Sequence, residues 1–222
     1  MNMFLLLFSG IAWSIVYIDS IRVGFRDKTF AMPLWALGLN IAWEILQSVF
    51  GFIQLGIGAQ ICVNAVWAIF DIFILITYFK YGYKHFPKAF NKNQFYLWGV
   101  LVIAISFIIQ YMFIVEFPIS DGASYAAYIQ NIIMSVLFIG MLVQRDSSEG
   151  QTKLIAYAKF LGTLAPTILI GLIGGEDPFN GEPSSFVFVL GLVCAVFDII
   201  YIIMLTKKQK DERIILERMG AK

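Results

Sequence analysis

Charged and turn-forming segments divide the chain into apolar stretches of nearly equal length. These stretches cover residues 2–19, 31–51, 59–79, 94–114, 122–143, 153–174 and 185–205. A bilayer core of roughly 30 Å is crossed by about 20 helical residues, so each stretch is long enough to span it. Because backbone groups in lipid are satisfied only by helices or a closed barrel, the pattern predicts an all-α bundle of seven transmembrane helices. We expect one domain over residues 1–206 and a charged tail over 207–222.

Composition agrees with a membrane protein, and the placement of charge predicts its orientation. The chain is 59% hydrophobic and 14% charged, with a mean hydropathy of +0.79. All of the 16 Lys and Arg residues except Lys159 lie in the first, third and fifth connections or in the tail. The positive-inside rule predicts that the N-terminus is outside or lumenal and that the C-terminus is cytoplasmic. The first stretch lacks a basic n-region and a cleavage pattern, so it is expected to stay as a helix. We expect a multi-pass protein of the cell membrane in a bacterium, or of the endoplasmic reticulum in a eukaryote.

A weak internal similarity suggests that the bundle has two related parts. The segment "AIFDIFILI" (68–76) matches "AVFDIIYII" (195–203), which aligns Asp71 with Asp198. Both segments are predicted to run in the same direction. The first three and last three helices are therefore candidates for parallel repeats, with the fourth helix restoring orientation. Apolar helices also resemble one another by composition, and parallel repeats are common among transporters.

A few ionisable residues fall within the apolar stretches or at their ends. They are Asp19, Glu44, Asp71, Lys159 and Asp198. Each would cost about 2.5–3.5 kcal/mol if it faced lipid, so we expect these side chains to face the bundle interior. They could be structural, for instance through an ion pair of Lys159 with Asp71 or Asp198. Asp19 lies beside Arg22 and is expected at the membrane interface.

Helical spacing groups these residues with other polar and aromatic side chains. The expected faces are Asn40, Trp43, Glu44 and Gln47; Asn64, Trp67 and Asp71; Tyr125, Tyr128 and Asn131; and Cys194, Asp198 and Tyr201. Residues three and four apart share one side of a helix, so the faces are predicted to converge on a cavity roofed by aromatic rings. The rise of a helix places Glu44 and Asp198 about 10 Å apart along the membrane normal, which suits an elongated apolar ligand.

Several kinds of chemistry lack the residues they need. The single histidine, His85, is in a connection, and Cys62 and Cys194 are in different helices, so no metal or haem ligand set is expected. No phosphate-binding glycine loop and no aspartate-rich cluster for a diphosphate is present. Retinal would need a lysine on the seventh helix, whereas Lys159 is on the sixth. No nucleic-acid partner is expected, and the oligomeric state stays open.

The motifs "NIAWE" (40–44) and "FDIIY" (197–201), set in seven helices with short connections, resemble the integral-membrane terpene cyclases of meroterpenoid biosynthesis. This family includes the paspaline-type indole diterpene cyclases and bacterial relatives. The resemblance implies that Glu44 and Asp198 are the two acids required for cyclisation. It also implies a hydrophobic prenylated substrate, often a terminal epoxide, and no metal or other cofactor.

The buried residues suit such a reaction. Protonation of an epoxide or alkene needs an acid in a dry site, and burial favours a carboxyl that keeps its proton. Glu44 is predicted to be this acid, oriented by Asn40 and Gln47, with Asp198 as a second acid, relay or final base. Aromatic faces such as Trp43, Trp67 and Tyr201 would stabilise carbocations. Asn64, Asp71, Tyr125, Tyr128 and Lys159 are expected to support or line the site.

Two other classes of protein stay open from the sequence. A small proton-coupled transporter of PQ-loop-like architecture would have the same helix plan and buried acids. No Pro-Gln pair is found in a helix, since Pro33 is followed by Leu34 and Pro166 by Thr167. A non-catalytic scaffold would not need several buried ionisable groups on converging faces.

Overall fold

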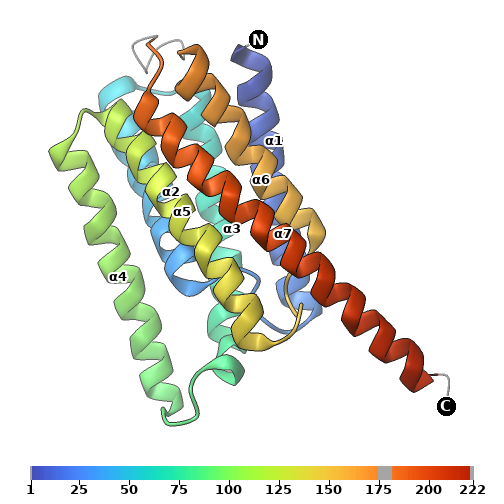
Figure 1. Ribbon diagram of the computed structural model, residues 1–222. Coiled ribbons are helices and arrows are strands. Elements are labelled where there is room, and N and C mark those ends of the chain that lie inside the picture. The colour runs from blue at the N-terminus through green and yellow to red at the C-terminus, as the bar shows by residue number, and fades with distance from the viewer. Residues whose placement is uncertain (1, 175–181, 221–222) are drawn as a thin grey trace.

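A bundle of seven long helices makes up the computed structural model, which describes residues 2–174 and 182–220 (Figure 1). The helices are α1 (Asn2–Arg26), α2 (Leu34–Leu55), α3 (Ala59–Tyr81), α4 (Lys92–Glu116), α5 (Ile119–Arg145), α6 (Lys153–Ile168) and α7 (Ser185–Gly220). A short 3₁₀ helix, η1 (Gly82–His85), follows α3, and a π-helical turn, η2 (Leu169–Ile173), follows α6. All seven long helices are apolar enough to cross a membrane, and the described ranges contain no strand. The predicted all-α seven-helix class is confirmed.

Two helices extend well beyond their predicted apolar stretches. Helix α1 continues past residue 19 to Arg26, and α7 continues past residue 205 to Gly220. Hydropathy marks only the part of a helix that tolerates lipid, whereas Lys, Arg, Gln and Glu favour helix as strongly as most apolar residues do. Residues 207–220 of the predicted tail are therefore helical, and they leave the bundle as a straight projection of α7 (Figure 1).

The helices pack as two groups of three, which we call the first half (α1–α3) and the second half (α5–α7). In each half the third helix packs against both others: α3 against α1 and α2, and α7 against α5 and α6. Helix α1 also packs against α6, and α2 packs against α5. If α1, α2 and α3 correspond to α5, α6 and α7, the α1–α6 contact corresponds to the α2–α5 contact. The helix contacts therefore have the twofold pattern expected of a parallel repeat. Helix α4 packs on α2 and α5 at the periphery (Figure 1).

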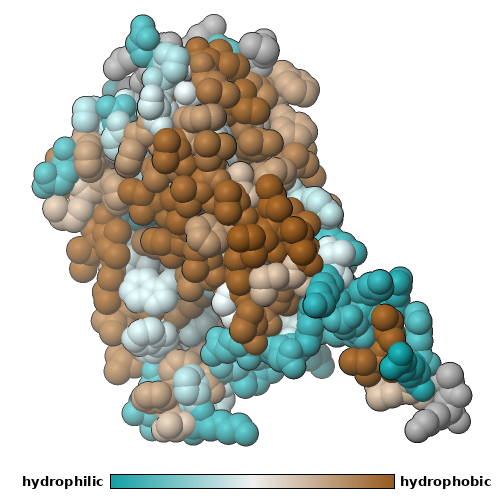
Figure 2. Space-filling model, viewed as in Figure 1, coloured by the Kyte–Doolittle hydropathy of each residue, from teal (hydrophilic) through white to brown (hydrophobic). Residues whose placement is uncertain are grey.

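One apolar core joins the two halves, and a broad apolar surface surrounds it. The core cluster includes Val16, Tyr17, Leu37, Trp67, Ile74, Met134, Phe138, Ile155, Tyr201 and Leu205. Outward-facing Ile, Leu, Val and Phe side chains cover the middle of the bundle, as Figure 2 shows for one face. Lipid tails are as apolar as these side chains, so close backbone packing rather than water exclusion holds such helices together. A Cβ on Gly191 of α7 would lie only 2.2 Å from Cγ2 of Thr167 on α6.

Helix α6 is irregular in its last turns. Pro166 lies inside the helix, where a proline has no N–H to donate and clashes with the preceding turn. The π-helical turn η2 follows directly, and the backbone N–H of Ser184 donates to the carbonyl of Ile170 at 2.9 Å. The predicted span 153–174 is thus an α-helix that ends in a π turn, a form that often accompanies a disrupted hydrogen-bond ladder.

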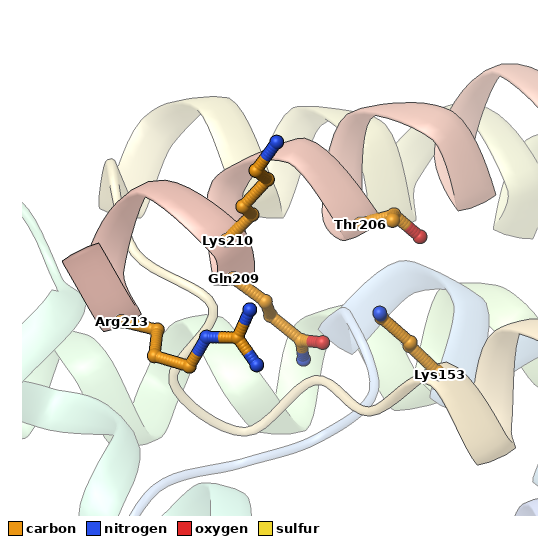
Figure 3. A pocket seen from close by; sticks show the side chains of 5 residues that line it. All are labelled: Lys153, Thr206, Gln209, Lys210 and Arg213. Atoms are coloured by element: carbon orange, nitrogen blue, oxygen red, sulfur yellow. The ribbon is translucent and has the colours of Figure 1, made fainter.

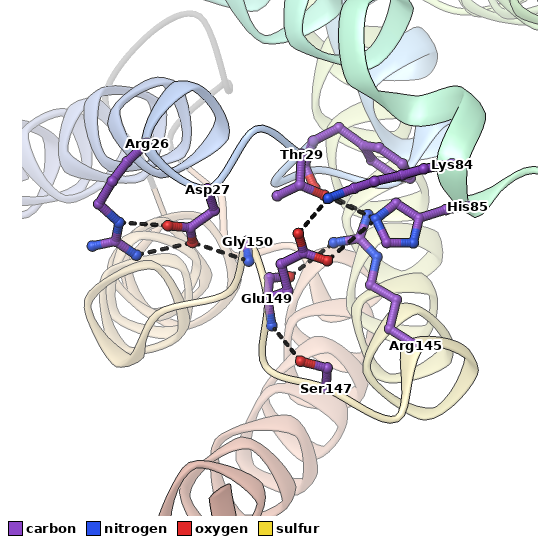
Figure 4. A network of polar contacts seen from close by, with 10 residues as sticks. Arg26, Asp27, Thr29, Lys84, His85, Arg145, Ser147, Glu149 and Gly150 are labelled. Atoms are coloured by element: carbon purple, nitrogen blue, oxygen red, sulfur yellow. Dashed lines mark hydrogen bonds and ion pairs between the residues drawn. The ribbon is translucent and has the colours of Figure 1, made fainter. Parts of the chain in front are cut away.

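Most basic residues gather at one end of the bundle, which we call the basic end. Here α1, α3 and α5 end and α7 leaves the bundle (Figure 1). Arg145, at the end of α5, donates through Nη1 to the carbonyl of Glu149 (2.9 Å) and through Nη2 to that of Phe30 (3.1 Å). The Glu149 carboxylate pairs with Lys84 (Figure 4). The three connections at this end are thereby fixed to one another.

The connection after α1 is held by a second group of contacts at the same end (Figure 4). Arg26 donates to Asp27 (Nε to Oδ1, 2.6 Å), and this hydrogen bond lowers the pKa of the Asp27 carboxyl. Gly150 has φ +74°, and a Cβ there would lie 2.6 Å from Cγ2 of Thr29. Glycine at position 150 therefore allows the connections after α1 and α5 to meet.

Candidate active site

A buried hydrogen-bond network joins the three helices of the first half. The Tyr17 hydroxyl of α1 donates to Oε1 of Glu44 on α2 at 3.0 Å. Asn40, one turn before Glu44, donates through Nδ2 to the Tyr17 oxygen (2.6 Å) and to Oδ2 of Asp71 on α3 (2.8 Å). None of these side chains is more than 5% exposed. We call Tyr17, Asn40 and Asp71 the first triad. Glu44 is joined to it by the hydrogen bond from Tyr17.

A second network joins the three helices of the second half. Lys159 of α6 donates through Nζ to Oγ of Ser135 on α5 (2.6 Å) and to Oδ1 of Asp198 on α7 (2.7 Å). All three side chains are almost fully buried. Ser135, Lys159 and Asp198 form the second triad. Of the two ion pairs considered for Lys159 from the sequence, the structure contains the one with Asp198.

The two triads have the same construction. In each, a nitrogen donor on the second helix bonds a hydroxyl on the first helix and an aspartate on the third. The donor is the neutral amide of Asn40 in the first half and the ammonium of Lys159 in the second. The halves therefore differ by one positive charge at equivalent places.

The two halves therefore differ in whether a buried carboxyl has a cation beside it. A buried carboxylate is tolerated when a cation pairs with it, whereas an unpaired one is so costly that the group takes up a proton. Oδ1 of Asp198 lies 2.7 Å from Nζ of Lys159, with which it forms an ion pair. In the described chain, neither Glu44 nor Asp71 is in an ion pair.

Each of these acids also has a free oxygen. Oε2 of Glu44, Oδ1 of Asp71 and Oδ2 of Asp198 are buried and have no hydrogen-bond partner among the described residues. A buried polar atom without a partner costs roughly 1–3 kcal/mol, which suggests that it serves another purpose. These oxygens are the atoms at which the site could give or accept a proton.

Aromatic and amide side chains surround the first triad. The Trp67 ring stacks on Tyr17, with centroids 5.6 Å apart and an interplanar angle of 27°. On the other side, Gln130 of α5 donates to Oδ1 of Asn40 at 3.4 Å and accepts from Gln110 of α4 at 2.7 Å. Asn40 is thus oriented by contacts from both halves, and Gln130 is in turn held by Gln110 of α4.

Some predicted site residues lie outside the two triads. Trp43 donates to the Ala123 carbonyl of α5 at 3.0 Å, and Gln47 is buried farther along α2. Asn64 accepts from Gln60, one turn earlier on α3. Of the predicted α2 and α3 faces, only Asn40, Glu44, Trp67 and Asp71 therefore meet at the first triad.

The predicted tyrosines also have separate positions. Tyr128 shares a hydrogen bond with Thr167 (3.1 Å), and Tyr125 packs against Phe186. The Tyr201 hydroxyl donates to Gln151 at 3.0 Å, toward the basic end. Asp19, expected at the interface, is 3% exposed and accepts from Arg22.

Sequence reasoning missed the two hydroxyls of the triads. Ser135 lies one turn beyond Asn131 and so continues the Tyr125, Tyr128 and Asn131 face, which was a usable signal. The sequence signal for Tyr17 was weaker. Tyr17 shares a helix face with Ser14, three residues earlier, but no charged residue lies near the middle of this helix to mark the face as polar. Within the described ranges, no three His, Cys, Asp or Glu side chains are grouped as a metal site would require.

Comparison with known proteins relates the chain to membrane enzymes. The model of the Pyr4-like transmembrane terpene cyclases matches residues 1–211. The Pyr4-family terpene cyclase mfmH of Annulohypoxylon moriforme is 31% identical over 165 residues, which are 72% of this chain and 66% of that protein. The terpene cyclase pyr4 of Aspergillus fumigatus is 26% identical over 93% of this chain and 86% of its own. The terpene cyclase ascF of Acremonium egyptiacum is 27% identical over 93% of this chain and 81% of that protein.

No solved structure matches the chain. The matching family and the relatives named above are terpene cyclases, so the comparisons give no support to the alternative of a PQ-loop-like transporter.

Proposed function

This chain belongs to the Pyr4-like transmembrane terpene cyclases, and from that membership we propose an acid-initiated cyclisation as its reaction. The substrate is a prenylated aromatic or related meroterpenoid precursor with a terminal epoxide or alkene. The initiating acid is Glu44 and the final base is Asp198.

The observation that carries this division of roles is the difference between the two triads. Lys159 compensates the charge of Asp198, which favours a carboxylate that can accept a proton. Glu44 is 2% exposed and bonded to a neutral tyrosine, which favours a carboxyl that keeps its proton. A pair of acids in environments that favour opposite protonation states is the usual arrangement for acid and base roles.

The proposed reaction leaves the composition of the substrate unchanged. Glu44 gives its proton to the epoxide oxygen, the C–O bond breaks, and a tertiary carbocation forms. Electron pairs of neighbouring alkenes attack in turn and close the rings. Asp198 then removes a proton next to the last cationic carbon, which leaves an alkene. The proton must return from Asp198 to Glu44 before the next turnover, so both acids are regenerated.

Aromatic side chains and the apolar surroundings support the cationic steps. The Tyr17 hydroxyl bonds Glu44 and the Trp67 ring stacks on Tyr17; an aromatic face attracts a cation by about 0.5–2 kcal/mol. A water-poor interior favours ring closure over hydration.

We also propose that the basic end faces the cytoplasm, because Lys and Arg are retained on that side. In this orientation the N-terminus is outside, and the charged part of α7 within residues 207–222 extends into the cytoplasm. The catalytic bundle is then the domain of residues 1–206.

The test uses membranes that contain the protein and a panel of epoxyfarnesyl and farnesyl aromatics. The expected product has the mass of the substrate and a different chromatographic retention. Glu44→Gln and Asp198→Asn should each reduce conversion by at least about 100-fold, since each removes an acid–base function. Asp121→Asn, in the first turn of α5, is the matched control and should leave conversion unchanged.

The outcome for each acid is judged separately. Wild-type turnover in Glu44→Gln membranes with normal protein levels would remove Glu44 from the mechanism, and the same holds for Asp198→Asn. No isomeric product from any substrate of the panel would contradict the proposed reaction.

A further inference from the structure

A hollow opens at the basic end, between the first turn of α6 and the place where α7 leaves the bundle. It has a volume of about 350 Å³ and is lined by Lys153, Thr206, Gln209, Lys210 and Arg213 (Figure 3). The predicted apolar stretches begin at 153 and end at 205 on these two helices. The hollow is therefore at the depth where a membrane-embedded bundle meets lipid headgroups.

Three of the polar side chains that line the hollow, Lys153, Gln209 and Arg213, have their polar ends near one another (Figure 3). Figure 3 shows the charged ends of Lys153 and Arg213 on either side of the Gln209 amide, with Lys210 reaching away along the helix. Gln209 is fixed because its Nε2 donates to the Gln151 carbonyl at 3.2 Å. The Thr206 hydroxyl is buried and has no hydrogen-bond partner in the described chain.

The positive charge of the hollow is not neutralised by the protein. Within residues 2–174 and 182–220, neither Lys153 nor Lys210 takes part in an ion pair. Arg213 is 3.7 Å from Glu217, but both side chains are about 70% exposed, so this pair is weak. An anion with several acceptor oxygens could accept hydrogen bonds from Lys153, Arg213 and the Thr206 hydroxyl together.

Apolar surface continues from the hollow along both helices. On α6, Tyr157 and Leu161 are exposed one and two turns after Lys153. On α7, Ile203, Ile199 and Val196 are exposed on the face that carries Thr206. A ligand that fits has a phosphate in the hollow and long apolar chains along these helices.

We propose that the hollow binds the phosphate of an anionic phospholipid, whose acyl chains lie along the exposed faces of α6 and α7. Basic sites between transmembrane helices at the membrane surface are suited to such headgroups. A zwitterionic lipid has the same phosphate, but its ammonium group would be repelled by Lys153 and Arg213. The site is separate from both triads and does not depend on the proposed cyclisation.

Native mass spectrometry of the full chain in detergent tests this proposal. Phosphatidylglycerol and phosphatidylcholine with identical acyl chains are added in equal amounts, and the bound adducts are counted. We expect the wild type to retain phosphatidylglycerol preferentially. Lys153→Gln with Arg213→Gln should weaken that retention by roughly 30-fold, given the attraction per cation at a membrane surface.

The matched control makes the same change in charge away from the hollow. Lys88→Gln with Arg218→Gln should retain phosphatidylglycerol as the wild type does. Equal losses in the two double variants would overturn the proposal in favour of general charge attraction. Release of the lipid by millimolar inorganic phosphate, or equal binding of the two lipids to the wild type, would also overturn it. Thr206→Val, which keeps the shape of the side chain, should give a smaller loss than the double variant.

Discussion

Replacing Lys159 with methionine should leave Asp198, the proposed base, without its cation and favour a neutral carboxyl in its place. The ammonium and the carboxylate are 2.7 Å apart, which corresponds to about 6 kcal/mol of attraction at an effective dielectric constant near 20. Methionine has nearly the length of lysine but no charge, so the carboxylate would be left buried without compensation. Removing one partner of a buried pair typically costs about 3–5 kcal/mol, and Asp198 avoids part of this cost by binding a proton.

Turnover should then fall by about 100-fold or more, because a protonated Asp198 cannot serve as base. Infrared spectroscopy provides a readout that does not depend on activity. The carbonyl stretch of protonated carboxyls should gain one group in Lys159→Met, and Asp198→Asn in the same protein should remove it. Lys159→Arg keeps a cation beside Asp198 and should preserve the wild-type carboxyl spectrum.

A matched variant separates charge from packing. Thr163→Val, one turn along α6, removes a buried hydroxyl that accepts from Asn131 at 2.6 Å, but it leaves the ion pair in place. It should change stability without changing the carboxyl spectrum. If Lys159→Met showed the wild-type spectrum and wild-type turnover, the assignment of Asp198 as a lysine-held base would be wrong.

Two further predictions concern the stability of the bundle, measured as the free energy of unfolding in detergent titrations. Gly191→Ala should cost about 1–3 kcal/mol, because its Cβ would be 2.2 Å from Thr167, whereas Gly140→Ala, with nothing within 4 Å, should be neutral or stabilising. Equal effects of the two substitutions would show that the α6–α7 approach is not tight. Thr152→Ala should cost about 1–3 kcal/mol, because the Thr152 hydroxyl accepts from the Ile155 N–H at the start of α6 and donates to the buried Asp19 carboxylate. Thr152→Ser should retain both hydrogen bonds and most of the stability.

The number and order of the helices could be predicted from hydropathy because lipid permits few alternatives. The ends of α1 and α7 could not, since Arg26 and the charged residues after 205 lie outside the lipid and still favour helix. The π turn after Pro166 was not predicted because the local sequence stays apolar through it. Within this turn Gly171 packs closely against Phe188 on α7, a contact that the local sequence does not reveal.

The spacing of residues along one helix predicted which site residues share a face, but not which helices bring those faces together. The face containing Asn40 and Glu44 is present, and Asp71 meets it. The partner of Lys159 was left open between two aspartates, because spacing within one helix says nothing about which helix is its neighbour. Tyr17 was missed for the same reason, since its role depends on contacts with α2 and α3.

The Lys159–Asp198 pair has a consequence for how the protein enters the bilayer. Alone, α6 would bring a lysine into the hydrocarbon and α7 an aspartate, each at a cost of about 2.5–3.5 kcal/mol. If Lys159 and Asp198 form their ion pair during insertion, the two charges compensate each other before either side chain faces lipid. We therefore expect α6 and α7 to leave the insertion machinery together as a helical hairpin. In that case the Lys159–Asp198 contact would matter for assembly of the second half as well as for the proposed chemistry.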